Sequence, residues 1–248
     1  MRISIITINY NNAPNLRGTI ESVINQTYRN VEYLVIDGAS TDGSGDIIKE
    51  FANEIDYWVS EKDKGIYNAM NKGLIKATGD YILYLNSGDY FADNNVLSDL
   101  ILDCAGKDIV YGNIGYYKND TLIELKSAEH IHFKTSYQHN LPPHPALLIK
   151  RVLLQQLHGF DEDYPIIADV VMIAKAFSIT GVTSKFKNRL VTIFDMNGVS
   201  SCKQNQQKIW EERKKFIEKE FPGYLSDLKE NWPPNIFKKI LNFVRRVI

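Results

Sequence analysis

The sequence predicts an α/β protein with a mostly parallel central sheet, helices on both faces and a C-terminal helical tail. Short apolar runs rich in β-branched residues alternate with segments whose apolar residues recur at helical spacing. Aspartates and turn-forming residues follow several of the apolar runs. The 248 residues are 44% apolar and 24% charged, values typical of a soluble globular protein rather than a disordered or fibrous one.

The first hundred residues alternate strand and helix patterns. The runs that predict strands are Ile3–Ile8, Val31–Ile36, Tyr57–Val59 and Tyr81–Leu85. Helical spacing predicts helices over Leu16–Ile24 (entered at Pro14), Ile47–Ala52 and Ile66–Ala77. This alternation predicts parallel strands whose carboxyl ends share one edge of the sheet, where ligands of such folds bind.

The second half has a different pattern. Its predicted elements are a strand over Asp108–Asn113, a hairpin tip at Lys118–Asp120, a rigid loop at Pro142–Pro145, an apolar run over Ala146–Ile149, a helix from about Asp169 to Thr180 and a strand over Val191–Phe194. We expect one domain over residues 1–202. Its first half (1–100) would bind the substrate that donates a group, and its second half (101–202) would bind the substrate that accepts it. Residues 203–248 form the helical tail.

Composition and missing motifs exclude several classes. With 29 basic and 30 acidic side chains the net charge is −1, which argues against nucleic acid as the main partner. The loop after the first strand, Asn9–Pro14, lacks the glycines of a nicotinamide-binding turn, and neither a P-loop nor the glycine-rich basic loop of a sugar nucleotidyltransferase is present. Two distant cysteines, no signal peptide and no apolar stretch of about 18 residues predict a cytoplasmic protein.

Three carboxylates follow successive strands: Asp37, Asp63 and Asp89. Such a set suits a nucleotide sugar, because one carboxylate can accept ribose hydroxyls while another holds Mg²⁺ or Mn²⁺ at the diphosphate. Each aspartate alone is equally well explained as a turn former or a helix cap. Their shared position at strand ends favours the binding site.

Longer strings resemble family 2 glycosyltransferases of the GT-A fold. They are Thr7–Asn11, Gln26–Tyr28, Val35–Ser44 and Ser60–Gly73, in matching order and spacing over residues 3–100 and more weakly to about 200. The resemblance implies that Thr7 and Asn9 lie by the base, that Asp37 binds the base or ribose, and that Asp63 faces the nucleotide. It also places Asp89 at the last position of the family's acidic metal-binding motif.

That acidic motif departs from the family pattern. Many members carry Asp-x-Asp-Asp where this chain has Asn86-Ser87-Gly88-Asp89, so one carboxylate remains. Asn86 still offers a carbonyl oxygen, a ligand that hard cations accept. We expect Mg²⁺ or Mn²⁺ to be used, with weak affinity in the absence of the donor.

The resemblance further implies that Asp169, which ends the segment Gly159–Asp169, is the general base of an inverting transfer. A helix-start aspartate that complements the helix dipole is the alternative. His144, between two prolines, is a candidate for the acceptor side of the cleft, although a lone loop histidine is more often structural or exposed.

The last 14 residues, 235–248, predict an amphipathic helix with an apolar face and a basic face. The pattern suits peripheral contact with an anionic membrane on the inner face of the cell membrane. A helix packed on the domain, or a dimer contact, is the alternative. Oligomerisation is left open.

Together these features predict an inverting glycosyltransferase of surface-polysaccharide synthesis. It would move a sugar from a nucleotide diphosphate, UDP first and GDP next, to a hydroxyl of a glycan or lipid-linked acceptor. The depleted acidic motif leaves one alternative, a nucleotide-sugar-binding protein with lost or weak transferase activity.

Overall fold

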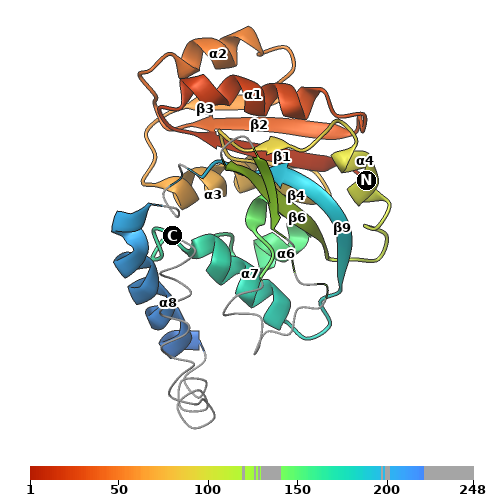
Figure 1. The fold of residues 1–248 in the computed structure, drawn as a ribbon, viewed down its shortest axis with the longest axis vertical. Helices are drawn as coiled ribbons and strands as arrows, with labels where there is room; N and C mark the ends of the chain where they lie inside the picture. The colour runs from red at the N-terminus through yellow and green to blue at the C-terminus, as the bar shows by residue number, and fades with distance from the viewer. Residues whose placement is uncertain are drawn as a thin grey trace. The chain divides into compact units, whose positions relative to one another are not determined.

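A computed structural model of the chain describes residues 1–118, 121–125, 127, 129, 141–196, 198 and 202–220. It divides into two compact units, residues 1–195 and 196–248. The first unit contains the whole central sheet and the three aspartates that follow its N-terminal strands (Figure 1). The boundary lies seven residues before the domain end predicted from the sequence.

The N-terminal half has the predicted strand–helix order. Its elements are β1 (Ile3–Asn9), α1 (Ala13–Ile24), β2 (Val31–Asp37), α2 (Ser44–Glu50), β3 (Tyr57–Ser60), α3 (Ile66–Lys76) and β4 (Tyr81–Tyr84). These four strands pair in parallel in the order β3-β2-β1-β4. The hydrophobic runs of β1, β2 and β4 form strands that are buried on both faces, whereas the edge strand β3 is partly exposed.

The second half extends the sheet with mixed pairing. Its elements are β5 (Tyr90–Phe91), α4 (Val96–Ile101), β6 (Ile109–Lys118), β7 (Thr121–Leu125), the 3₁₀ helix η1 (His144–Ala146), β8 (Leu147–Lys150), α6 (Arg151–Gln156), α7 (Ala168–Ser178) and β9 (Ser184–Ile193). The sheet continues β4-β8-β6-β9-β5, and β7 pairs with β6 as the predicted hairpin. β8 runs antiparallel to both β4 and β6, so the continuous parallel arrangement ends at β4, although β6 and β9 again pair in parallel. Residues 119 and 120 of the predicted hairpin tip lie outside the described residues.

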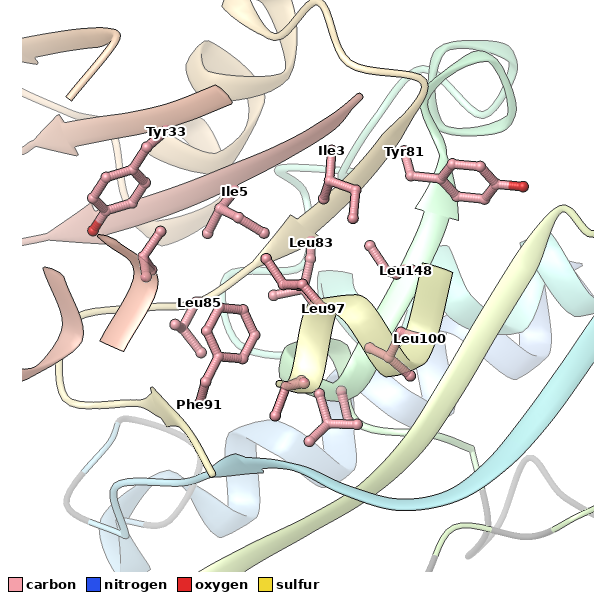
Figure 2. Close-up of a cluster of buried hydrophobic side chains, with 14 of the residues drawn as sticks. Ile3, Ile5, Tyr33, Tyr81, Leu83, Leu85, Phe91, Leu97, Leu100 and Leu148 are labelled. Carbon is pink, nitrogen blue, oxygen red and sulfur yellow. The ribbon is translucent and has the colours of Figure 1, made fainter. Parts of the chain in front are cut away.

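Alternate residues of the strands face two separate helical layers. Ile3, Ile5 and Leu83 face the layer formed by α1, α2 and α4, where Leu97 and Leu100 pack against the sheet (Figure 2). Ile6 faces α3, which approaches so closely that a Cβ on Gly73 would lie 2.5 Å from Ile6 Cγ2. Both faces of the N-terminal strands are therefore apolar, and polar side chains collect where the strands end.

The second unit contains η3 (Lys203–Asn205) and α8 (Gln206–Glu220). The predicted amphipathic segment 235–248 lies outside the described residues. Within the described part of the chain, no helix is both long enough and apolar enough to span a bilayer.

Candidate active site

Strand register brings polar residues into one row at the carboxyl end of the sheet. Asn9 at the end of β1 pairs with Asp37 at the end of β2, and Asp37 pairs with Ser60 at the end of β3. The parallel strands thus place three residues that are 28 and 23 positions apart side by side. This edge is the place where the sequence predicted the donor.

Asp37 is fully buried and accepts four hydrogen bonds. Its Oδ1 accepts from Asn9 Nδ2 at 2.8 Å and from Ser40 Oγ at 2.6 Å. Its Oδ2 accepts from the Ser40 backbone N–H at 3.0 Å and from Ser60 Oγ at 2.5 Å. Burial alone raises the pKa of Asp37, but these hydrogen bonds outweigh burial and hold the pKa below its usual value.

The Asp37 network joins two loops. Ser40 Oγ accepts from the Asn11 backbone N–H at 2.8 Å, and Asn11 Oδ1 accepts from the Thr41 N–H at 2.8 Å. Asn11 is in a left-handed conformation, φ 48°, which asparagine tolerates better than most residues. Tyr10, which lies between Asn9 and Asn11 in the chain, is 69% exposed. This edge of the sheet therefore presents an aromatic ring to solvent.

Asp63 lies against the same edge. Its Oδ1 forms a 2.6 Å ion pair with Lys72 Nζ, which also contacts Glu61 at 2.7 Å. A Cβ on Gly38 would lie 3.1 Å from both Asp63 Oδ2 and the Tyr10 ring. A residue without a side chain at position 38 is therefore what lets the carboxylate and the aromatic ring come this close.

Asn86 to Asp89 form a tight turn after β4, in which the Asp89 N–H donates to the Asn86 carbonyl at 3.0 Å. Gly88 has φ 105°, a conformation that favours glycine, and a Cβ there would lie 3.0 Å from an Asp195 carboxylate oxygen. Asp89 Oδ1 accepts from the Asp195 backbone N–H at 2.9 Å. The turn is thus closed against the segment that follows β9.

The Asp89 carboxyl is 3% exposed, and its Oδ2 has no hydrogen-bond partner among the described residues. Burial raises the pKa of Asp89 to about 7; the Asp195 N–H and His144 lower it, while the Asp195 carboxylate raises it. The Asn86 Oδ1 is likewise buried without a partner in the described part of the chain. Two buried oxygens that lack donors fit a cation, which would accept them as ligands.

The described residues contain no group of three or more His, Cys, Asp or Glu side chains that could hold a metal by themselves. A cation here would therefore depend on the oxygens of a bound diphosphate and of water for the rest of its shell. That arrangement is ordinary for Mg²⁺, which is usually held by one or two carboxylates and by substrate phosphates.

Asp169 lies in the first turn of α7, and two side chains from other elements hold its carboxylate. His144 Nδ1 lies 2.8 Å from its Oδ2, and the Tyr67 hydroxyl lies 2.8 Å from its Oδ1. The side chains of His144 and Asp169 are 13% and 19% exposed, so the pair borders solvent. Burial raises the pKa of Asp169, but His144, Tyr67 and the Val170 N–H lower it more, and the net pKa is below its usual value.

His144 also contacts the Asn86 turn, with Nε2 3.2 Å from Asn86 Nδ2. It sits in η1, which is fixed by the Thr192 hydroxyl donating to the Pro145 carbonyl at 2.5 Å. One imidazole therefore links Asp169 from the second half of the chain to Asn86 from the first.

Of the predicted residues, Asn9, Asp37 and Asp63 gather at the ends of β1 to β3, and Asn86, His144 and Asp169 form one connected chain. Asp89 belongs to the same turn as Asn86. Thr7 lies inside the sheet, fully buried, with its hydroxyl 2.8 Å from the Leu85 carbonyl and 3.0 Å from the Tyr33 hydroxyl. Its expected contact with the nucleotide base stays a prediction, and the burial of Thr7 inside the sheet does not favour it.

The sequence patterns did not single out the side chains that hold these residues: Tyr10, Ser40, Ser60, Tyr67, Lys72 and Asp195. All of them except Asp195 belong to strings that carry the family resemblance, and this was the one signal available for them. Asp195 follows a predicted strand, as the three chosen aspartates do, and that position was its only signal.

Comparison with known proteins identifies the family and the fold of the chain. The model of glycosyl transferase family 2 matches residues 4–159. An uncharacterized glycosyltransferase of Mycobacterium tuberculosis is 32% identical over 212 residues, which are 82% of this chain and 78% of the relative. A PGL/p-HBAD biosynthesis glycosyltransferase of Mycobacterium bovis is 26% identical over 201 residues, 79% of this chain and 77% of that protein.

Two solved structures share the fold. TarS 1–349 of S. aureus in complex with UDP-GlcNAc has a TM-score of 0.65 at 18% identity; the match covers 78% of this chain and 58% of that one. The mannosyltransferase PcManGT of Pyrobaculum calidifontis, in complex with GDP-Man and Mn²⁺, has a TM-score of 0.61 at 18% identity, over 97% of this chain and 68% of that one. The family match and the relatives show that the chain belongs to glycosyl transferase family 2, and the solved structures show the GT-A fold. The chain is therefore a glycosyltransferase of that family and fold.

Proposed function

We propose that the protein is an inverting transferase that moves a sugar from a nucleotide diphosphate, UDP before GDP, to a hydroxyl of a glycan or lipid-linked acceptor in surface-polysaccharide synthesis. The observation that carries the proposal is the position of Asp169. This carboxylate borders solvent in the second half of the chain and is connected through His144 to the Asn86 turn at the donor edge.

The donor would bind along the row at the ends of β1 to β3. Tyr10 offers an exposed ring for the base, and Asp63 offers a carboxylate for hydroxyl groups once Lys72 is displaced or shared. Asp37 has all four acceptor positions occupied by protein donors, so it acts mainly by holding the two loops that frame the nucleotide. Preorganised loops of this kind reduce the entropy lost when the donor binds.

Mg²⁺ or Mn²⁺ would be held by Asp89 Oδ2 and Asn86 Oδ1, two oxygens of the same turn that are buried and lack donors among the described residues. The cation would neutralise the charge that develops on the departing diphosphate. PcManGT was solved with GDP-Man and Mn²⁺, and TarS with UDP-GlcNAc, which supports a nucleotide-sugar donor and a divalent cation for this chain.

Asp169 would act as the base. In an inverting transfer the acceptor hydroxyl attacks the anomeric carbon from the side opposite the leaving group, and a carboxylate takes its proton. The lowered pKa keeps Asp169 ionised at neutral pH. Tyr67 and His144 fix the carboxylate plane, which leaves its remaining lone pairs to the acceptor hydroxyl.

The test measures release of UDP or GDP from a panel of nucleotide sugars with candidate acceptors and Mn²⁺, and determines the product anomer by NMR. The wild-type protein should turn over with inversion, and Asp169→Asn should abolish transfer while donor binding by calorimetry survives. Background release with every donor would favour the alternative of a nucleotide-sugar-binding protein, which the single carboxylate of the Asn86 turn motivates. Undiminished transfer by Asp169→Asn would remove Asp169 from its role.

Peripheral membrane contact through residues 235–248 is a separate proposal, supported by the sequence pattern alone. Co-sedimentation with anionic liposomes should be strong for the full chain and weak for a chain that ends at residue 231. Equal co-sedimentation of the two would argue against the membrane contact and for a packed or dimer-forming helix.

A further inference from the structure

The hydrogen-bonding capacity of His144 fixes its tautomer. An ionised carboxylate only accepts hydrogen bonds, so the Nδ1 atom that lies 2.8 Å from Asp169 Oδ2 must carry a proton. The other nitrogen, Nε2, lies 3.2 Å from the Asn86 amide nitrogen, which can only donate, so Nε2 carries the lone pair and accepts. The two contacts together place the ring proton on the Asp169 side and the lone pair on the Asn86 side.

The orientation of the Asn86 amide has to match an accepting Nε2. Its amide can present either an NH₂ donor or a carbonyl acceptor, and only the NH₂ group can pair with an accepting Nε2. The structure has Asn86 Nδ2 at 3.2 Å from His144 Nε2. The Oδ1 atom is consequently turned away from His144, where it is buried and without a hydrogen-bond partner among the described residues.

We propose that His144 is a positioning residue that orients the base through Nδ1 and, through Nε2, turns the Asn86 amide so that its oxygen is presented to the cation and diphosphate. The inference rests on the proposed function, since it assigns a task to the same site. The side-chain amide of Asn86 could turn either its NH₂ group or its oxygen to the cation. The contact with His144 selects the oxygen, so Asn86 can serve at a position where the family resemblance implies a carboxylate.

Two substitutions separate the two contacts. In His144→Asn the side-chain NH₂ occupies roughly the place of Nδ1, so the bond to Asp169 survives while the reach to Asn86 is lost. In His144→Gln the longer amide reaches the place of Nε2 and can accept from Asn86, whereas the donor to Asp169 is lost. His144→Ala removes both.

The experiment measures two quantities for each variant. The first is the affinity for Mn²⁺, from the EPR signal of free Mn²⁺, in the presence of UDP or GDP, whichever tightens Mn²⁺ binding to the wild-type protein. The second is kcat, with KM for the donor. Loss of a neutral hydrogen bond predicts about 5- to 10-fold weaker Mn²⁺ binding for His144→Asn, with a smaller loss in kcat at saturating Mn²⁺. Loss of a bond to a charged group predicts about 10- to 100-fold lower kcat for His144→Gln, with Mn²⁺ affinity within about threefold.

Two controls accompany the pair. His158→Asn changes an exposed histidine with φ 60°, a conformation that asparagine tolerates, and should alter neither quantity. Asn86→Ala should weaken Mn²⁺ binding, and adding His144→Asn to it should cause no further loss, because both act through one oxygen. Urea unfolding of every variant identifies any that fail to fold, and the Asn86→Ala comparison then carries the test.

The inference is overturned if the Asn and Gln variants lose both quantities in parallel, or if His144→Ala binds Mn²⁺ as tightly as the wild type. A fully additive Asn86→Ala and His144→Asn pair would also overturn it. Failure of the proposed function looks different: the wild type would show no turnover, or Asp169→Asn would transfer normally. A wild-type protein whose Mn²⁺ binding is not strengthened by nucleotide would contradict both.

Discussion

Replacing Asp37 should show how much stability the donor edge draws from one carboxylate. Asp37→Ala removes a buried group that accepts four hydrogen bonds, from Asn9, from Ser60 and twice from Ser40. A hydrogen bond to a charged group contributes about 1.5–3 kcal/mol, but four that share one acceptor do not add, since the serine hydroxyls can turn to other partners. The Ser40 backbone N–H cannot turn. We expect the free energy of unfolding to fall by about 3–5 kcal/mol, because several buried donors lose their acceptor at about 1–3 kcal/mol each.

Asp37→Asn should cost much less, about 1–2 kcal/mol. An amide oxygen in place of Oδ2 keeps the bonds from the Ser40 N–H and the Ser60 hydroxyl. The new NH₂ group then faces Asn9, whose own Oδ1 is buried without a hydrogen-bond partner among the described residues. If the Asn9 amide turns over, its oxygen accepts from the new NH₂ and the network closes again.

Urea unfolding followed by tryptophan fluorescence measures both variants, with linear extrapolation to water. Asp46→Asn is the control, because that carboxylate is 86% exposed and its substitution should change the free energy by less than about 0.5 kcal/mol. The account of the network would be refuted if the free energy of unfolding of Asp37→Ala lay within about 1 kcal/mol of that of this control. It would also be refuted if Asp37→Asn lowered that free energy as much as Asp37→Ala does.

The pH dependence gives an independent check on Asp37. Its pKa is lower in the folded protein than in the unfolded chain, so between the two values the unfolded chain binds more protons. The stabilisation is therefore complete above the unfolded pKa of about 4 and is lost as the pH falls through the folded pKa. Asp37→Asn should lack this part of the acid-induced loss of stability.

Four further substitutions test other parts of the chain. Gly159→Ala should cost more than about 2 kcal/mol in urea, because φ is 72° and a Cβ would lie 2.4 Å from Asn71 Oδ1; Gly45→Ala, in open space on α2, should instead stabilise by about 0.5–1 kcal/mol. Arg189→Ala should cost about 1–3 kcal/mol by the same measurement, since it removes a guanidinium that bonds two carboxylates at 2.6–2.8 Å. The pKa of Asp89 is about 7 in the folded protein, so between about pH 4 and about pH 7 the folded state binds more protons and the free energy of unfolding falls as the pH rises. Asp89→Asn should flatten this slope in urea unfolding. It should also abolish the proton release that accompanies Mn²⁺ binding below about pH 7.

The sequence was informative where one local rule decides the structure. Apolar runs such as Ile3–Ile8 are buried on both faces, and the period of 3.6 between Leu16 and Ile24 is that of a helix. The ends of these runs predicted that Asp37, Asp63 and Asp89 share one edge, and the family resemblance added Asn9. Parallel pairing follows from strand–helix alternation, which is why the N-terminal half could be predicted strand by strand.

Pairing in the second half could not be predicted in the same way. The run Ala146–Ile149 is apolar in any sheet position, and nothing in it states that β8 inserts between β4 and β6 in antiparallel orientation. That insertion is what carries η1, and with it His144, to the Asn86 turn. The contact between His144 and Asp169 joins residues 25 positions apart and depends on the packing of two elements, so residue types alone could not reveal it.

The helix α3 relates the two halves of the site to each other. Its first turn supplies Tyr67, which holds Asp169, the proposed base, and five residues later Lys72 holds Asp63 at the proposed donor edge. One rigid helix thus fixes the positions of both carboxylates, and the close approach of Gly73 to Ile6 sets its distance from the sheet. An in-line attack tolerates little error in the distance between base and donor. A glycine in mid-helix costs stability relative to alanine, and here that cost allows the close packing that keeps both ends of the site in register.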